Sequence, residues 1–188
     1  MLEGKTVDLR VMEREDVDFL AEHRNDLNCM GEYWPDIEQV SKSDWVKQFD
    51  NPSSLGVLLE VKRFIIQKKD RTRIGVIHHF LDSPHHLMEL ACWLVPSESK
   101  KGYATEATQL MVDYLFLSKE IARIQAIVAV RNVASQRVLE RAGFQREGTM
   151  RDESFDRGEW RDYYLYSIVR REWKEPRILT KTTIHPEG

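Results

Sequence analysis

Apolar and charged residues alternate in "KTVDLRVM" at 5–12, which is the pattern of a strand with one buried face. The next segment, "EREDVDFLAEHRND" at 13–26, changes to helical spacing and carries acidic residues in its first turn. Such residues favour the start of a helix, so we expect one here. A second short helix is predicted at 41–50, with Ser41 or Ser43 as its cap.

Three strand candidates follow one another at 57–68, 73–82 and 87–95. The intervening "KDRT" and "SPHH" are typical of hairpin turns, which indicates antiparallel pairing. The third strand ends before Pro96, because proline cannot donate a hydrogen bond to a sheet.

The second half of the chain mixes helices and strands. An apolar stripe predicts a helix at 102–118, and the apolar run "IQAIVAV" at 124–130 predicts a buried strand. A short helix follows at 132–143, and two last strands are expected around the "RG" turn at 157–158. The order β-α-α-β-β-β-α-β-α-β-β predicts an α+β domain, with a mixed, mostly antiparallel central sheet flanked by helices.

Composition sets the broad class of the protein. The chain has 188 residues, 41% hydrophobic and 31% charged, which fits one ordinary globular domain. Its formal net charge of −3 gives no basic field, so we expect no nucleic-acid partner. The two cysteines, Cys29 and Cys92, cannot form a disulfide framework or a four-thiolate zinc site, and no metal is expected. A charged N-terminus and the lack of a long apolar segment predict a cytoplasmic protein without a membrane partner.

The segment "SESKKGYATEATQLM" at 97–111 turns from a polar loop into a helix. The first turn of a helix has unpaired N–H groups and the positive end of the helix dipole, so it stabilises an anion such as a diphosphate. Gly102 lets the backbone approach closely, Thr105 adds a hydroxyl, and Lys100 and Lys101 add charge. A solvated surface loop would explain the same residues.

A second polar pair, Asn132 and Ser135, follows the buried strand at the opening of the next helix. Residues of these types are most often helix caps at such a place. A functional interpretation has Asn132 holding an amide of an extended cofactor arm, with Ser135 near the reactive end of that arm.

These motifs together resemble a known family. "ELACWLVP" followed by "GYATEA", and later "N-x-x-S" and "AGF", are similar to the GNAT superfamily of acetyl-CoA-dependent N-acetyltransferases. The resemblance is to the RimJ/RimL-type branch, which acetylates N-terminal α-amines of ribosomal proteins. Relatives of that branch act on polyamines, amino acids or aminoglycosides. The similarity covers most of residues 4–173, so we place one acetyltransferase domain at 1–175 and a C-terminal tail at 176–188.

The resemblance implies acetyl-CoA as the acetyl donor. In the family, a Gln/Arg-x-x-Gly-x-Gly/Ala loop binds the pyrophosphate, and Ser99 replaces the usual first residue here. Lys100 or Lys101 would supply the missing charge. The resemblance thus assigns pyrophosphate binding to Lys100, Lys101, Gly102, Tyr103, Ala104 and Thr105.

The resemblance also implies that strand 87–95 splays from strand 124–130, with the pantetheine arm in the opening. The backbone of Trp93, Leu94 and Val95 would pair with the arm, Asn132 would hydrogen-bond it, and Ser135 would lie near the thiol. Many relatives carry a tyrosine, the proton donor to the thiolate, where this chain has Leu139. Ser135 is therefore our candidate for that role.

Acetyl transfer to an amine requires a neutral nitrogen, a polarised carbonyl and a proton for the leaving thiolate. Glu89 interrupts an apolar strand, and a carboxylate there is costly unless it is paired or hydrated, so Glu89 is the candidate base. A salt-bridged glutamate at a sheet edge is the alternative. A backbone N–H near Trp93 to Val95 would stabilise the oxyanion.

The substrate is less defined by the sequence. Glu32 in the acidic loop 31–39 would attract a cationic amine, and His78 could line the site. Charges in such a loop are more often simply solvated, and a histidine on a strand is more often a packing residue. A peptide N-terminus, a polyamine, an amino acid and an aminoglycoside all stay open, as does a homodimer. Because Ser99 and Leu139 replace residues with chemical roles, a catalytically impaired CoA-binding sensor or interaction module is the alternative function.

Overall fold

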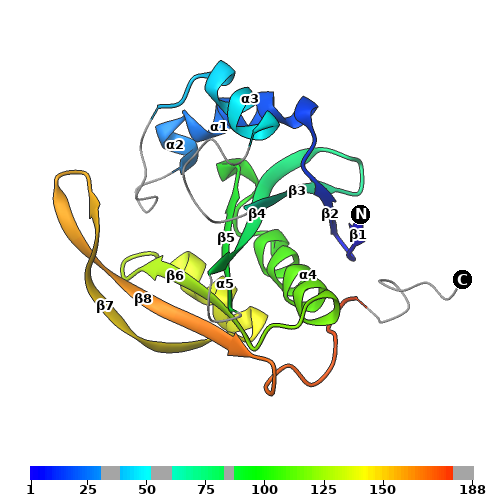
Figure 1. The fold of residues 1–188 in the computed structure, drawn as a ribbon, viewed down its shortest axis with the longest axis vertical. Coiled ribbons are helices and arrows are strands. Elements are labelled where there is room, and N and C mark those ends of the chain that lie inside the picture. Colours follow the sequence, from blue (N-terminus) through cyan, green and yellow to red (C-terminus); the bar gives the residue numbers. More distant parts are fainter. Residues whose placement is uncertain (31–38, 52–60, 83–86, 180–188) are drawn as a thin grey trace, which may run out of the picture.

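The computed structural model describes residues 1–30, 39–51, 61–82 and 87–179. Its strands form one eight-stranded sheet in the order β1-β2-β3-β4-β5-β6-β8-β7 (Figure 1). Every neighbouring pair is antiparallel except β5 and β6, which are parallel. The expected mixed, mostly antiparallel sheet is therefore confirmed. The strands are β1 (Leu2–Glu3), β2 (Val7–Val11), β3 (Lys62–Lys68), β4 (Arg73–Asp82), β5 (Leu87–Leu94), β6 (Arg123–Ala129), β7 (Gln145–Asp156) and β8 (Glu159–Val169).

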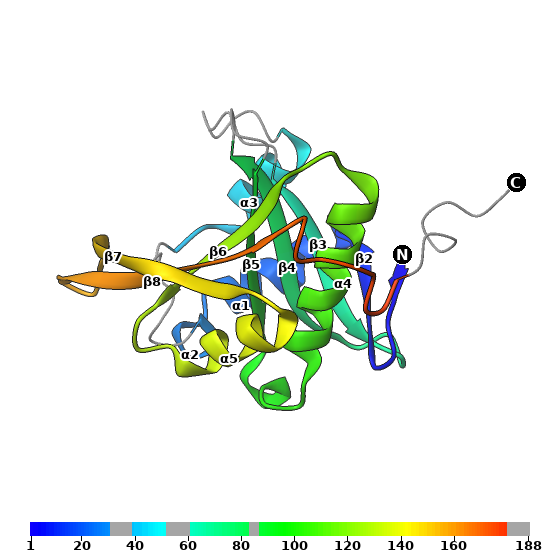
Figure 2. The same ribbon diagram turned by 90° about the horizontal axis from the view of Figure 1, so that it is seen from below.

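Helices cover both faces of the sheet (Figures 1 and 2). The first three pack on one face over Ile65, Val76 and Trp93, and we call this the α1 face. The last two pack on the other, the α4 face, over the larger apolar core. The helices are α1 (Val17–Arg24), α2 (Leu27–Met30), α3 (Lys42–Asp50), α4 (Tyr103–Ser118) and α5 (Val133–Ala142), with 3₁₀ turns η1 (Arg14–Asp16) and η3 (Pro96–Glu98).

Most predicted elements occur within a few residues of their expected bounds. Ser41 caps α3, because its Oγ accepts a hydrogen bond from the Asp44 amide at 3.1 Å. The helix expected at 13–26 is instead split into η1, α1 and α2. Residues 157–158 both have positive φ angles, of 50° and 86°, which is the backbone of a tight hairpin turn. The expected "SPHH" turn and the first part of the strand at 57–68 lie outside the described residues.

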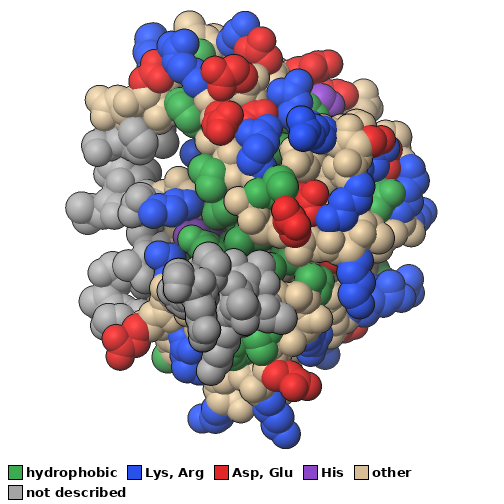
Figure 3. Space-filling model, turned by 90° about the vertical axis from the view of Figure 1, so that its right-hand side faces the viewer, with side chains coloured by type: hydrophobic (Ala, Val, Ile, Leu, Met, Phe, Trp, Pro, Cys, Tyr) green, Lys and Arg blue, Asp and Glu red, His purple; other side chains and the backbone are tan. Residues whose placement is uncertain are grey.

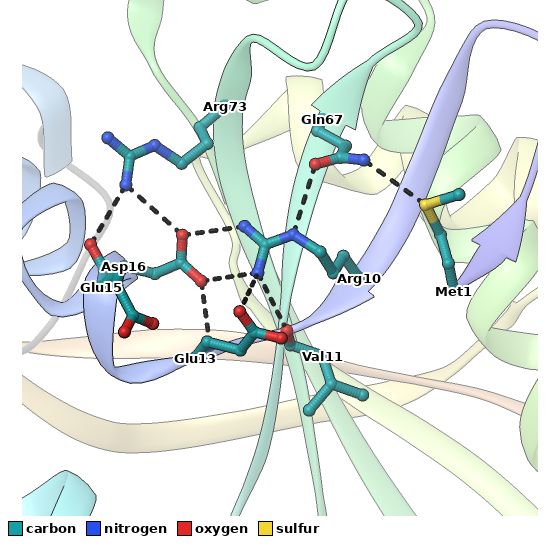
Figure 4. A network of polar contacts seen from close by, with 8 residues as sticks. All are labelled: Met1, Arg10, Val11, Glu13, Glu15, Asp16, Gln67 and Arg73. Atoms are coloured by element: carbon teal, nitrogen blue, oxygen red, sulfur yellow. Dashed lines mark hydrogen bonds and ion pairs between the residues drawn. The ribbon is translucent and has the colours of Figure 1, made fainter.

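A buried carboxylate ties the start of α1 to the sheet (Figure 4). Asp16 is 3% exposed, and both its oxygens accept hydrogen bonds of 2.9 Å from Arg10 on β2. The Glu13 amide and Arg73 on β4 also donate to it, at 2.9 and 3.4 Å. Burial alone would raise the pKa of Asp16, but the hydrogen bonds from Arg10 and the Glu13 amide outweigh it and lower that pKa. The ion cluster therefore fixes the helices of the α1 face against β2 and β4.

The chain ends by crossing α4 as a C-terminal strap, residues 173–179. Asp113 on α4 is fully buried and accepts hydrogen bonds from the Trp173 indole at 2.9 Å and from three consecutive backbone amides, at 177–179. Leu179 is 1% exposed. Residues 176–179, which the sequence assigns to the tail, thus pack against the domain.

The surface carries charges of both signs. On the side of the molecule seen in Figure 3, acidic and basic groups are interspersed over the described residues. Within the parts of the chain that the structure describes, no helix combines the length and hydrophobicity of a membrane span.

Candidate active site

The two central strands part soon after they begin to pair. β5 and β6 are paired in parallel at only three positions, of which the last joins Glu89 and Gln125. Beyond that pair, β5 stays bonded to β4 and β6 to β8, so the strands diverge (Figure 1). We call the Glu89–Gln125 pair the fork, and the opening between residues 90–94 and 126–129 the gap. The splay that the resemblance implied is present.

The gap offers unpaired backbone from one side of β5. The Val95 amide donates to Ile74 on β4 at 2.8 Å, and the Val95 carbonyl accepts from the Glu98 amide at 3.0 Å. Because hydrogen-bonding directions alternate along a strand, Trp93 also directs its groups to β4, whereas Leu94 directs its groups into the gap. Of the three residues expected to pair with a cofactor arm, Leu94 is therefore the one placed to do so.

A carboxylate and an amide meet at the fork. Gln125 donates from Nε2 to Glu89 Oε2 at 3.0 Å, and both side chains are half-buried. Glu89 shares the α1 face with Trp93, because residues two apart on a strand point to the same side. The sequence singled out Glu89 but missed Gln125, although a polar residue in the apolar run "IQAIVAV" was a usable signal.

The loop before α4 has the backbone expected of an anion site. Gly102 is the N-cap of α4 with a φ of 90°, and among the described residues no side chain caps the helix. A Cβ added at Gly102 would meet no described atom within 4 Å, so the helix start is open on that side. The first-turn amides of Tyr103, Ala104 and Thr105 have no partner within the helix. Lys101 pairs with Glu98 at 3.0 Å, while Lys100 is exposed and has a positive φ of 63°.

A hollow of about 430 Å³ lies beside this helix start. Gly102 and Thr105 line it on one side, and Lys5, Arg141 and Arg177 bring three cationic side chains to its walls. The arginines come from α5 and from the C-terminal strap, so sequence reasoning about the loop alone did not find them. The lining also includes Glu106, whose carboxylate accepts hydrogen bonds from the backbone of Lys5 and Thr6. With three cations against one carboxylate, the hollow beside the helix start suits a ligand with several phosphate charges.

The helix after the gap is capped as its sequence indicates. Asn132 Oδ1 accepts a hydrogen bond from the Ser135 amide at 3.0 Å, which confirms the capping prediction. That bond leaves the Asn132 side-chain NH₂ for any functional contact. Leu139 is 8% exposed and belongs to the core of the α4 face, so an aliphatic side chain fills the place of the family's tyrosine.

The two expected substrate residues have different outcomes. Glu32 lies outside the described residues. His78 is paired across strands with Ala91 and therefore lies on the α1 face with Glu89. Burial, followed by the charges of Arg63 and Arg24, lowers the pKa of His78 to about 3. His78 is thus a neutral hydrogen-bonding group at physiological pH.

The fold and the gap together define an acetyltransferase. Residues 6–145 match the acetyltransferase (GNAT) domain, which is more than half of the chain. The protein belongs to this family, and its acetyl donor is acetyl-CoA.

Individual relatives agree with this assignment. The chain is 31% identical over 169 residues to the uncharacterized N-acetyltransferase p20 of Bacillus licheniformis, covering 88% of this chain and 93% of the relative. It is 27% identical over 166 residues to the spermidine N(1)-acetyltransferase of Vibrio cholerae, covering 88% and 94%. A solved structure of the spermidine N-acetyltransferase from Vibrio cholerae, in complex with CoA and spermine, superposes with a TM-score of 0.77 at 25% identity, covering 89% and 97%.

Proposed function

We propose that this enzyme transfers an acetyl group from acetyl-CoA to a primary amine that approaches the fork from the α1 face. The separation of β5 and β6 directly after the Glu89–Gln125 pair carries the proposal. Beyond that pair, the edges of β5 and β6 are no longer joined to each other. A thioester held between the parted strands would meet an amine arriving from the α1 face.

The cofactor contacts follow from the free groups around the gap. The first-turn amides after Gly102 would hold the pyrophosphate, with Lys100 supplying charge. Arg141 and Arg177 would face the remaining phosphate from the adjoining hollow. The backbone of Leu94 and the side-chain NH₂ of Asn132 are the expected partners of the pantetheine arm.

Glu89 is the proposed base. Its carboxylate would take a proton from the amine, directly or through one water molecule, and Gln125 fixes one of its oxygens. An α-amine titrates near neutrality, so a modest base is sufficient. When bound, acetyl-CoA supplies the activated acyl carbonyl. The Leu94 N–H would stabilise the oxyanion that develops there. The Ser135 hydroxyl would pass a proton to the departing thiolate while it takes one from a solvent water, and the amine proton held by Glu89 would return to solvent afterwards.

The acceptor substrate in this proposal is a primary amine that binds at the α1 face. The relative from Vibrio cholerae binds spermine, and this supports a polyamine as one candidate. Peptide amines, amino acids and aminoglycosides are the others. Homodimer formation and the expected cytoplasmic location stay part of the proposal, to be tested by light scattering and by cell fractionation.

A CoA-binding sensor without catalysis is the second candidate. It is favoured by Leu139, which is buried in the core where relatives have a tyrosine. Such a protein would bind CoA through the same loop and leave every amine unmodified.

Two measurements separate these functions. Calorimetry with CoA tests the cofactor site, and release of free thiol from acetyl-CoA with a panel of amines tests transfer. We expect binding and amine-dependent thiol release. Binding without turnover on any amine would establish the sensor, and no heat with CoA at millimolar concentration would reject both functions.

A further inference from the structure

A second hollow, of about 310 Å³, lies where β6 ends against the β7–β8 hairpin. This hairpin extends away from the body of the protein in both ribbon views (Figures 1 and 2). We call the hollow the hairpin pocket. Its walls include Arg131, Asp156, Trp160, Arg161 and Tyr163.

The hairpin pocket lies on the same face of the sheet as the fork. Gln125 and Ala129 are paired across strands with Ser167 and Tyr163, so all four share the α1 face with Glu89. Ile127 lies midway between the fork and the pocket on this face and is 36% exposed. An extended molecule could therefore lie along β6 and reach from the fork to the hairpin pocket.

Two buried polar atoms at the pocket lack hydrogen-bond partners among the described residues. Asp156 is 3% exposed, and its Oδ1 accepts no hydrogen bond; the nearest cation, Arg157 Nε, is 3.7 Å away. The buried Nε of Arg161 donates none, although the same side chain pairs with Glu159 at 2.7 Å through Nη1. Buried polar groups are normally satisfied, and each unsatisfied one costs about 1–3 kcal/mol. The pocket thus presents one acceptor and one donor.

A peptide group satisfies both atoms at once, because its N–H can donate to Asp156 and its carbonyl can accept from Arg161. A polyamine carries donors only, so it could pair with Asp156 but would leave the Arg161 Nε without an acceptor. The charges of Arg131 and Arg161 are offset by those of Asp156 and Asp162 in the same lining, so net charge does not draw a polycation into the pocket. The chemistry of the pocket therefore favours a peptide over a polycation.

The spacing sets the length of the peptide. Gln125 and Ala129 are four residues apart on one strand, or about 13 Å at about 3.3 Å per residue. We propose that the hairpin pocket binds the backbone of a peptide substrate about four residues beyond the amine that is acetylated at the fork. Asp156 and Arg161 are then the specificity residues. This inference rests on the proposed function and names the substrate class.

The test measures binding as well as turnover. N-acetylated product peptides of two and five residues, with neutral side chains and amidated C-termini, are titrated into the CoA-bound enzyme by calorimetry. We expect the pentapeptide to bind about tenfold more tightly than the dipeptide, as about one charged hydrogen bond would provide. The free peptides and spermidine are then compared as substrates, and kcat/KM should rise with peptide length.

The double variant Asp156→Leu/Arg161→Met removes both polar atoms together, a change that buried pairs often tolerate. It should bring the pentapeptide to the dipeptide's affinity and leave the dipeptide unchanged. Glu153→Gln is the control, because Glu153 is exposed on the same hairpin and does not line the pocket. The single variant Asp156→Asn keeps the size of the side chain, and it should lose only part of the preference for the pentapeptide over the dipeptide.

Equal binding of the two peptides would overturn the inference, whether or not the variants fold, and would mean that water alone fills the pocket. A preference for spermidine that the pocket variants do not alter would overturn it too. Tight pentapeptide binding with no turnover on any amine would instead support the pocket and reject the proposed transferase activity. The two proposals can therefore fail separately.

Discussion

Gln125 holds Glu89 by a hydrogen bond of 3.0 Å at the last pair of residues before β5 and β6 separate. The bond crosses between two strands that share only three paired positions. This bond therefore marks the end of the gap at which the two strands begin to separate, and it also orients the Glu89 carboxylate.

Removing either partner at the fork should lower turnover. Glu89→Gln should reduce kcat by about 100-fold or more, because the proposed base is lost. Gln125→Leu should reduce kcat by about tenfold with the KM for acetyl-CoA unchanged, since the carboxylate stays but loses the hydrogen bond that fixes its Oε2. Steady-state kinetics with acetyl-CoA and the best amine of the panel measure both effects. An unaltered kcat in Glu89→Gln would exclude Glu89 as the base.

Replacing Gly102 should weaken CoA binding as well as lower the stability of the fold. Its φ is 90°, so Gly102→Ala should cost about 1 kcal/mol of folding free energy. The added methyl group points into open space beside the first-turn amides, so we also expect the Kd for CoA to rise about tenfold.

Gly158→Ala is the matched control for that substitution. Gly158 has a φ of 86° and equally open surroundings, but it lies in the turn between β7 and β8. Thermal unfolding should show a similar loss in both variants, whereas calorimetry should show weaker CoA binding in Gly102→Ala alone. Equal CoA affinity in the two variants would count against the pyrophosphate site.

Asp16 should contribute stability that depends on pH. Asp16→Asn should lower the free energy of unfolding at pH 7 by about 3 kcal/mol, because Arg10 keeps its charge and loses its buried partner. The pKa of Asp16 is lowered in the folded state, so its contribution is present above the ordinary carboxyl value of about 4. That contribution is lost as the pH falls through the folded pKa.

Urea unfolding of wild type and Asp16→Asn at a series of pH values checks this dependence. The difference between them should shrink as the pH falls below about 4. Asp18→Asn serves as the control, since Asp18 makes an exposed ion pair with Lys42 and should change stability by less than about 1 kcal/mol at any pH. A constant difference for Asp16→Asn would contradict the prediction.

Truncation should locate the end of the folded domain. A chain ending at residue 175 loses three of the amides that bind Asp113, and it leaves a fully buried carboxylate with the Trp173 indole. We expect a loss of about 3 kcal/mol or more. A chain ending at residue 179 keeps these contacts and is the control. If both truncated chains unfolded at the same denaturant concentration, the expected boundary after residue 175 would stand.

Elements with strong local patterns could be predicted from the sequence. The strand at 73–82 has the predicted bounds, and the helix predicted at 102–118 begins one residue later, at Tyr103. Asn132 caps its helix as its residue type indicates. The splay came from the resemblance, since the residues of strands 87–95 and 124–130 carry no local sign of it.

Contacts between distant segments could not be predicted in this way. Gln125 meets Glu89 only because parallel pairing sets that register, and no local pattern encodes it. Glu106 on α4 binds the backbone at Lys5 and Thr6, across 100 residues of sequence or more. The break between α1 and α2 also lacks the proline or glycine that usually marks one.

The C-terminal strap has a consequence for biosynthesis. Asp113 finds its last partner 66 residues further along the chain, at Leu179. At about 5–20 residues per second, the ribosome needs roughly 3–13 seconds to make that stretch. During this interval α4 carries a carboxylate that has to stay hydrated, so the helix cannot dock fully on the nascent sheet. Chains that stall in this window would expose the apolar side of α4 to chaperones and proteases.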